Sequence, residues 1–75
     1  MLDSKILLQL VQMKMPFGKH KGKLICNIPM KYLERFKRKG FPKGQLGMLM
    51  ETMYEIRLNG LERLLEPLKK IDPDS

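Results

Sequence analysis

The residues on which most enzyme chemistry depends are scarce in this sequence. Among 75 residues there are one cysteine (Cys26), one histidine (His20) and no tryptophan. A single cysteine excludes an internal disulfide and fits a reducing compartment. A zinc site needs about four ligands, more than Cys26 and His20 supply, and a Cys–His dyad would have no third group to orient it. We therefore expect no metal, no cofactor and no enzymatic activity, and we expect His20 to lie at the surface.

The carboxylates suggest no catalytic arrangement either. Glu51 and Glu55 are four residues apart, and so are Glu62 and Glu66. Acids at this spacing share a helix face and could chelate a divalent cation. No aspartate cluster accompanies either pair, and charge pairs of this kind are usually solvated helix faces. We expect solvated faces here.

Long apolar runs are also missing. The run Ile6-Leu7-Leu8 is broken at once by Gln9, whereas a secretory signal needs roughly 7–15 consecutive apolar residues. A transmembrane helix needs about 20. The expectation is a soluble, cytoplasmic protein that does not enter a membrane.

Acidic residues are nearly absent from residues 14–43, where basic residues are concentrated. Ten of the fifteen lysines and arginines lie in this window against one acid, Glu34, which gives the window a charge of +9. The other 45 residues hold five bases and seven acids, a charge of −2. One face should therefore be strongly positive, and polyanions are the usual partners of such a face. A merely solubilising surface is the alternative.

The apolar periodicity predicts one mainly helical domain, residues 1–70, of about four helices with one small β-hairpin inserted after the first helix. The tail, residues 71–75, should fray. Asp3 or Ser4 can cap the first helix, and Pro16 should end it.

Helix start and stop signals place the other three helices. Pro29 announces the second helix and Gly40 should end it. The third helix should run to about Asn59, and Pro67 should disturb or end a short last helix. The third helix is expected to bury the following residues: Leu46, Leu49, Met50, Met53, Tyr54 and Leu58.

The stretch between the first two helices has a different character. Gly18 and Gly22 bracket a basic turn, with Phe17 before it and Leu24 and Ile25 after it. Two short extended pieces around a glycine-containing turn predict a small β-hairpin lying on the helices. Phe17 is expected in the core, because a small domain needs each large apolar side chain, although its ring could instead offer a stacking face.

The hairpin is the first candidate site for an anion. Its glycines allow backbone N–H groups to approach an anion closely, and lysines supply point charges for phosphate. The side chains proposed to contact the anion are Lys19, His20, Lys21 and Lys23.

Two further segments are candidates. Lys43 and Gly44 stand at the start of the third helix, where free N–H groups favour phosphate. Gly44 and Gly47 form a Gly-x-x-Gly pair like the backbone clamp of the KH domain, or they serve tight helix packing. The second helix could form a basic ridge with Tyr32 as an exposed aromatic residue. Its cations are Lys31, Arg35, Lys37, Arg38 and Lys39.

Several stretches of the chain, from about Met13 to Leu68, resemble one family. They are similar to the small bacterial proteins known as "putative quorum-sensing-regulated virulence factors", a description of expression that leaves the mechanism open. The stretches are Met15-Pro-Phe-Gly-Lys-His-Lys-Gly-Lys23, Ile28-Pro29, Tyr32-Leu33, Lys39-Gly-Phe-Pro-Lys-Gly-Gln-Leu-Gly47 and Ile56-Arg-Leu-Asn-Gly-Leu61.

A second resemblance is confined to the Phe17-Gly-Lys-His-Lys-Gly22 motif with Pro29 and Tyr32-Leu33. It is similar to a short segment found beside some bacterial DNA-exonuclease domains. This implies an accessory module near nucleic acid, without nuclease activity, since the acidic metal-binding residues of such exonucleases are missing here. Phe36 stands where those segments often carry tryptophan.

Charge and motifs together predict a non-enzymatic module that contacts phosphates of nucleic acid, DNA or RNA, with weak sequence preference. The alternative is an adaptor that binds a protein or a second copy of itself, in a role linked to virulence regulation. Methionine-rich helix faces adapt to varied partners, and the third helix carries Met48, Met50 and Met53. Met48 and Met50 lie on opposite sides of that helix, so one of them should be exposed.

Overall fold

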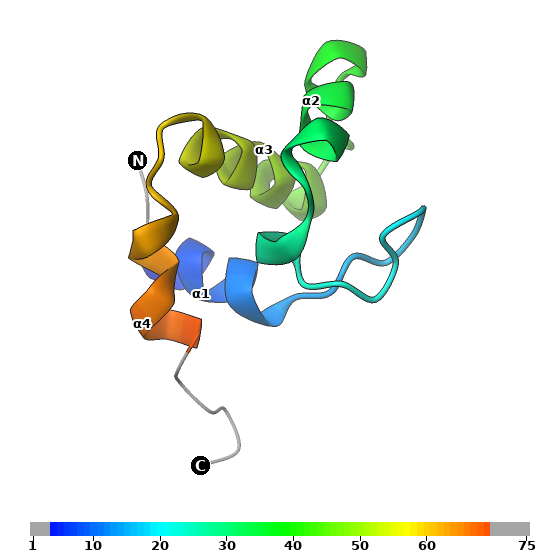
Figure 1. The fold of residues 1–75 in the computed structure, drawn as a ribbon. Coiled ribbons are helices and arrows are strands. Elements are labelled where there is room, and N and C mark those ends of the chain that lie inside the picture. The colour runs from blue at the N-terminus through cyan, green and yellow to red at the C-terminus, as the bar shows by residue number, and fades with distance from the viewer. Residues whose placement is uncertain (1–3, 70–75) are drawn as a thin grey trace.

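The computed structural model describes residues 4–69, so the expected cap at Asp3 and the expected frayed tail, residues 71–75, lie outside this range. Four α-helices and two 3-10 helices follow one another along the described chain (Figure 1). They are α1 (Ser4–Gln12), η1 (Ile25–Asn27), α2 (Met30–Lys39), α3 (Gln45–Leu58), η2 (Glu62–Leu65) and α4 (Glu66–Lys69). The expectation of a helical chain with about four helices is confirmed.

The limits of α2 and α3 follow from the residues that flank them. Pro29 precedes α2 in an extended conformation, with φ −63° and ψ 149°, a φ that its ring dictates. Gly40 ends α2 at φ 102°, which glycine adopts most readily, and its N–H donates to the Phe36 carbonyl at 2.6 Å. At the end of α3, the backbone and side-chain amides of Asn59 both donate to the Glu55 carbonyl, at 3.0 and 2.8 Å.

The prediction of a β-hairpin after α1 is wrong. Residues 4–69 contain no β-strand and only one antiparallel bridge, between Lys14 and Leu24. Pairing cannot extend further, because Ile25 already begins η1 on one side and Pro16 has no N–H to donate on the other. Three backbone hydrogen bonds close the segment, from Met15 N–H to Lys23 O (2.7 Å), from Gly22 N–H to Met15 O (2.8 Å) and from Ile25 N–H to Met13 O (2.9 Å).

The end of α1 also differs from the expectation. The helix stops at Gln12, four residues before Pro16. Beyond it, Met13 and Met15 hydrogen-bond with the segment that precedes α2. Pro16 has no N–H to donate to the Gln12 carbonyl, so the proline and these contacts both favour an end at this point.

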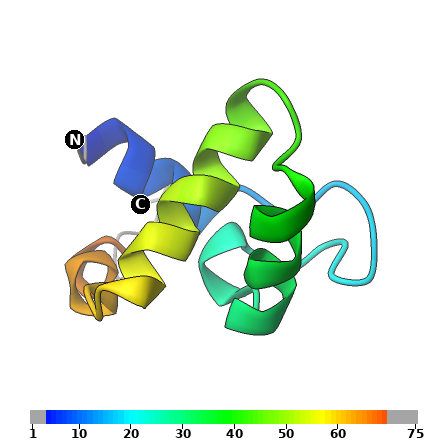
Figure 2. The same ribbon diagram turned by 90° about the horizontal axis from the view of Figure 1, so that it is seen from above.

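The core forms around α3, which runs between α1 and α4 on one side and α2 on the other (Figure 2). Leu49, Met50 and Met53 are buried as expected, Leu46 and Tyr54 are half-buried, and Leu58 is exposed. Among residues 4–69 the buried apolar side chains of the core are Leu10, Val11, Met15, Ile25, Cys26, Ile28, Leu33, Leu49, Met50, Met53, Ile56 and Leu65.

One side of the molecule is therefore formed by α2 and by the segment before it. The segment of residues 16–23, here called the basic loop, projects beside α2 and away from α1 and α4 (Figure 1). Within residues 4–69 no helix is long and apolar enough to cross a bilayer.

Candidate functional site

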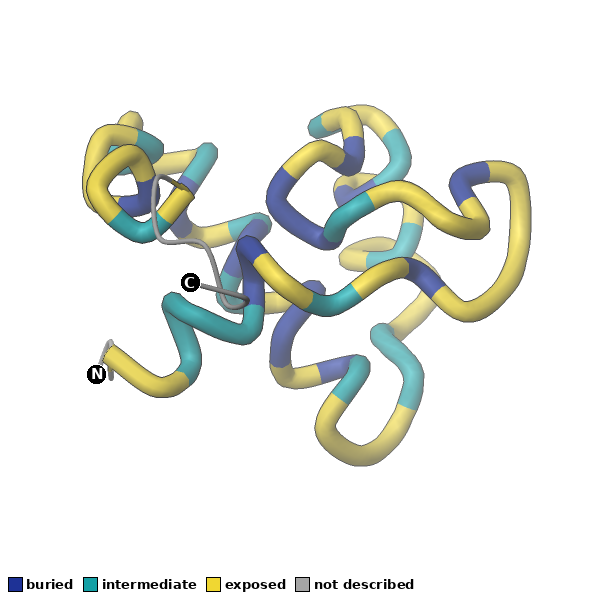
Figure 3. The backbone as a smooth tube through the Cα atoms, turned by 90° about the horizontal axis from the view of Figure 1, so that it is seen from below, coloured by how far each residue is buried: buried dark blue, intermediate teal, exposed yellow. Residues whose placement is uncertain are grey.

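The basic loop is exposed along almost its whole length (Figure 3). Its backbone turns twice, with an N–H of Lys21 donating to Gly18 O at 3.1 Å and that of Lys23 donating to His20 O at 3.0 Å. Gly18 and Gly22 have φ of 81° and 89°, values that residues with a Cβ rarely adopt. Lys19, Lys21 and Lys23 are all exposed, so the turns present three ammonium groups to solvent.

Tyr32 of α2 holds the basic loop in place. The His20 ring meets the Tyr32 ring edge to face, with centroids 4.6 Å apart, and Tyr32 in turn meets Phe36 at 5.2 Å. Such aromatic pairs stabilise by about 0.5–1.5 kcal/mol beyond the area they bury. Gly18 lies so close to the Tyr32 hydroxyl that a Cβ at Gly18 would be 2.6 Å from the oxygen.

His20 is buried, and the expectation of a surface histidine is wrong. Only 8% of the residue is exposed, and its Nδ1 has no hydrogen-bond partner. Burial lowers the pKa of His20 below its ordinary value, and the positive charges of Lys23 and Lys19 lower it further. The imidazole therefore favours its neutral form.

The basic loop and α2 form the walls of a hollow of about 240 Å³, here called the loop–helix hollow. It brings one cation of the loop together with two of α2, around the Tyr32 ring. Two of the segments predicted to bind an anion, the basic turn and the second helix, therefore lie side by side. The lining residues are Lys19, His20, Pro29, Lys31, Tyr32 and Arg35.

The other cations of α2 are divided over two further hollows. One, of about 440 Å³, opens between α2 and α3 and is lined by Lys31, Glu34, Arg35, Lys37, Arg38 and Tyr54. The other, of about 230 Å³, is lined by Tyr32, Arg35, Phe36 and Lys39. Arg35 is common to all three hollows, so the hollows adjoin one another at this side chain.

The start of α3 is separate from these hollows. Lys43 and Gly44 are exposed and line none of the three. Gly47 is buried, and a Cβ there would collide with the carbonyl oxygen of Pro42. The second glycine of the Gly-x-x-Gly pair therefore allows close packing of α3 against the link that precedes it. This is the packing interpretation of the pair and not the phosphate clamp.

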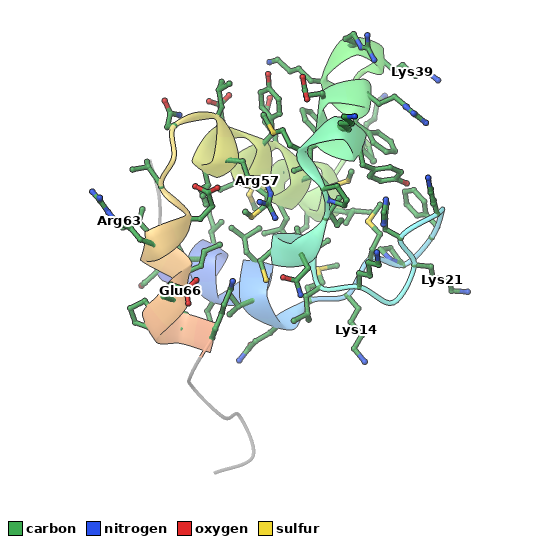
Figure 4. All side chains as sticks on the ribbon, in the orientation of Figure 1. Lys14, Lys21, Lys39, Arg57, Arg63 and Glu66 are labelled. Carbon is green, nitrogen blue, oxygen red and sulfur yellow. The ribbon has the colours of Figure 1, made fainter. Side chains whose placement is uncertain are left out.

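The acid of α2, Glu34, lines one hollow together with four cations, but it forms no ion pair with them in the described part of the chain. Within residues 4–69 the ion pairs are Arg57 with Glu62 at 4.0 Å and Lys69 with Glu66 at 3.6 Å. Neither involves the basic loop or α2. Figure 4 shows the labelled Lys21 and Lys39 on one side and Glu66 on the other.

Sequence reasoning missed the central position of Tyr32, and it placed Phe17 wrongly. Phe17 was expected in the core and is 43% exposed. Tyr32 was expected to be exposed and is half-buried between His20 and Phe36. No local pattern distinguishes these cases, because each depends on how the basic loop lies against α2.

The single cysteine, Cys26, is part of the hydrophobic core. Cys26 is 3% exposed, burial raises the pKa of its thiol, and its carbonyl accepts a hydrogen bond from Arg57 Nη2 at 2.7 Å. A neutral buried thiol is a poor nucleophile. Among residues 4–69, no three His, Cys, Asp or Glu side chains are grouped so that they could hold a metal ion.

These features describe a small helical protein in which a basic loop packs against a basic helix. The chain belongs to the family described as "putative quorum-sensing-regulated virulence factor", whose model matches residues 3–68. It is 40% identical over 70 residues to "Uncharacterized protein YpeB" of Escherichia coli K12, covering 92% of this chain and 97% of that protein. The YpeB of Escherichia coli O157:H7 matches equally well. No solved structure matches. The family expected from the sequence is confirmed.

Proposed function

We propose that this protein is a non-enzymatic module that binds nucleic acid through its phosphates, with weak sequence preference. The observation that carries the proposal is the loop–helix hollow, where Lys19, Lys31 and Arg35 surround one aromatic ring. A phosphate in this hollow would meet three cations from two separate elements. The compartment we propose is the cytoplasm.

The unpaired state of these cations supports the proposal. In the described part of the chain the acids that form ion pairs, Glu62 and Glu66, lie away from the basic loop and α2. Cations without internal partners can neutralise external phosphates and release their counterions, which is the main source of non-specific affinity for nucleic acid. The helix beside the hollow, α2, carries no asparagine or glutamine that could pair with base edges, so a preference for particular sequences is not expected.

The absence of enzymatic activity is also part of the proposal. His20 contacts an aromatic ring and no carboxylate orients it, and the Cys26 thiol is buried with a raised pKa. Neither side chain has the partnered setting of a general base or a nucleophile.

Fluorescence anisotropy of labelled DNA and RNA, titrated with protein at several salt concentrations, tests the proposal. Six phosphate contacts would give log K a slope of about −5 against log salt for duplex DNA. The double variant Lys19→Glu, Lys31→Glu should bind far more weakly. Its matched control is Arg63→Glu, Lys69→Glu, which lowers the net charge equally, from +7 to +3, but outside the hollow.

Three results would contradict the proposal: no binding at 50 mM salt, a slope near zero, or equal losses in the two double variants. Thermal denaturation of each variant separates lost binding from lost folding. Equal losses would mean that net charge alone, and no particular surface, attracts the nucleic acid.

The alternative proposal is an adaptor that binds a protein partner or a second copy of the chain. Its specific support is three exposed apolar side chains outside the basic loop, Met48, Leu58 and Leu64, which are 38%, 58% and 38% exposed. Analytical ultracentrifugation tests self-association directly. An apolar interface would give a concentration-dependent mass that high salt does not reduce, whereas a monomer at all concentrations would exclude the homodimer.

A further inference from the structure

We propose that the nucleic acid bound at the basic loop is single-stranded, and that the Phe17 ring stacks on an unpaired base while cations of the loop–helix hollow contact the neighbouring phosphates. This inference rests on the proposed function and deepens it, because it names the strand state and the residue that contacts a base.

Phe17 differs from the other aromatic residues of the chain, which are two tyrosines and two further phenylalanines. Tyr32 meets Phe36, and Phe41 meets Tyr54 with ring centroids 6.3 Å apart. Phe17 alone has no ring partner in the described part of the chain, and it is 43% exposed. Full burial of a phenylalanine would stabilise a small domain, so its exposure has a cost.

The position of Phe17 also sets it apart from the other exposed apolar residues. Met48, Leu58 and Leu64 are aliphatic and lie on α3 and η2. Phe17 is on the basic loop, two residues before Lys19, which is at most about 7 Å along the backbone. Stacking of bases on an aromatic ring beside cations that follow the phosphates is how many proteins bind single strands without sequence preference.

The backbone of Phe17 is two residues from Lys19, which lines the hollow. Gly18 follows Phe17 directly and fits against the Tyr32 hydroxyl so closely that no Cβ could be added without a shift. Tyr32 itself lines the hollow with Lys19 and Arg35. The backbone that carries Phe17 is therefore held close to the cations of the hollow before any ligand binds. Bases in a duplex are already stacked on one another, whereas those of a single strand offer a free face.

The chain has no tryptophan, so the variant Phe17→Trp carries a single fluorescent reporter at the proposed stacking position. We would titrate it with a short oligothymidylate, with an abasic strand of equal length, and with a duplex. Stacking should quench the emission with oligothymidylate and leave it unchanged with the abasic strand and with the duplex.

Affinity measurements complete the test. Phe17→Ala should bind oligothymidylate at least about fivefold more weakly, since one stacked base contributes about 1–3 kcal/mol. Its affinity for the abasic strand should not change. The control is Leu58→Ala, which removes an apolar side chain that is 58% exposed on α3 and should alter neither affinity.

The outcomes distinguish this inference from the proposed function. If Phe17→Ala binds oligothymidylate as tightly as the natural chain, with the steep salt dependence retained, the stacking inference is overturned and phosphate binding stands. If no strand binds at low salt, both are overturned. A blue shift of Phe17→Trp emission with anionic phospholipid vesicles, without quenching by oligothymidylate, would also overturn the inference and assign the basic loop to a membrane surface.

Discussion

Gly47 is the residue at which α3 touches the link from α2. Alanine is a better helix former than glycine by about 1 kcal/mol, yet here its methyl group would collide with the backbone of Pro42. We expect Gly47→Ala to lower the free energy of unfolding by about 1–3 kcal/mol, as overpacked sites do. Urea denaturation measures it, and Glu51→Ala, at an exposed site on the same helix, should change stability by less than about 0.5 kcal/mol. A Gly47→Ala variant as stable as the natural chain would contradict this prediction and would show that the backbone at Pro42 can shift to accommodate a methyl group at little cost.

His20 should make stability depend on pH. Burial and the charges of Lys23 and Lys19 lower its pKa in the folded chain, and Lys31 and Arg35 face it across the loop–helix hollow. Between the ordinary histidine pKa of about 6.5 and the lower folded value, the unfolded chain binds the extra proton. The free energy of unfolding should therefore be highest above that ordinary value and fall as pH drops through this window.

The variant His20→Phe tests this dependence, because it keeps an aromatic ring against Tyr32 and removes the titrating group. Thermal denaturation at pH 7.5 and at pH 5 should show a smaller loss of stability on acidification for His20→Phe than for the natural chain. An identical loss in both proteins would assign the pH dependence to other groups.

At the scale of elements, the attachment of the basic loop to α2 depends on the fit between Gly18 and Tyr32. Gly18→Ala should destabilise the chain, because it places a Cβ 2.6 Å from the Tyr32 hydroxyl and because a positive φ costs a residue with a Cβ about 1–2 kcal/mol. Tyr32→Phe removes the hydroxyl and keeps the ring contacts to His20 and Phe36.

A double-mutant cycle separates the two contributions. The double variant Gly18→Ala, Tyr32→Phe should be more stable than Gly18→Ala alone, because the close approach is relieved while the backbone strain persists. Urea denaturation of all four proteins measures the coupling. Strict additivity of the two changes would mean that the close approach of Gly18 to the Tyr32 hydroxyl has no energetic consequence.

At the scale of the whole molecule, the net charge of +7 is concentrated on one side and repels itself. Such repulsion destabilises the compact state and is screened by salt. We expect Lys21→Glu to raise the melting temperature at low salt, by an amount equivalent to a few tenths of a kcal/mol, while it weakens binding of nucleic acid. This combination would show that the charge is kept for a partner at some cost to stability.

Arg63→Glu is the matched control, since Arg63 and Lys21 lie on opposite sides of the molecule (Figure 4). It makes the same change of charge beside the acids of η2 and α4, so it should lower the melting temperature slightly and leave binding intact. If both variants shift stability in the same direction, the separation of charge has no energetic consequence.

The sequence by itself determined where several helices begin or end, and it determined the uneven distribution of charge along the chain. Pro29, Gly40 and the Asn59-Gly60 pair end or begin helices through their own backbone geometry and hydrogen bonds, so these limits could be predicted without knowing the rest of the fold. The concentration of cations in residues 14–43 is likewise a property of the chain itself.

Tertiary structure alone decided the form of the segment between α1 and α2. Strand pairing there stops at one bridge, between Lys14 and Leu24, and the conformation of the segment is set by contacts with Tyr32 of α2. The same contacts bury His20 and leave Phe17 exposed, two outcomes opposite to those expected from residue type. At Gly47 the deciding contact is with Pro42, only five residues away, but it depends on how the link between α2 and α3 turns back onto α3. Where a residue's environment comes from distant parts of the chain, its own sequence neighbourhood carries too little information to predict it.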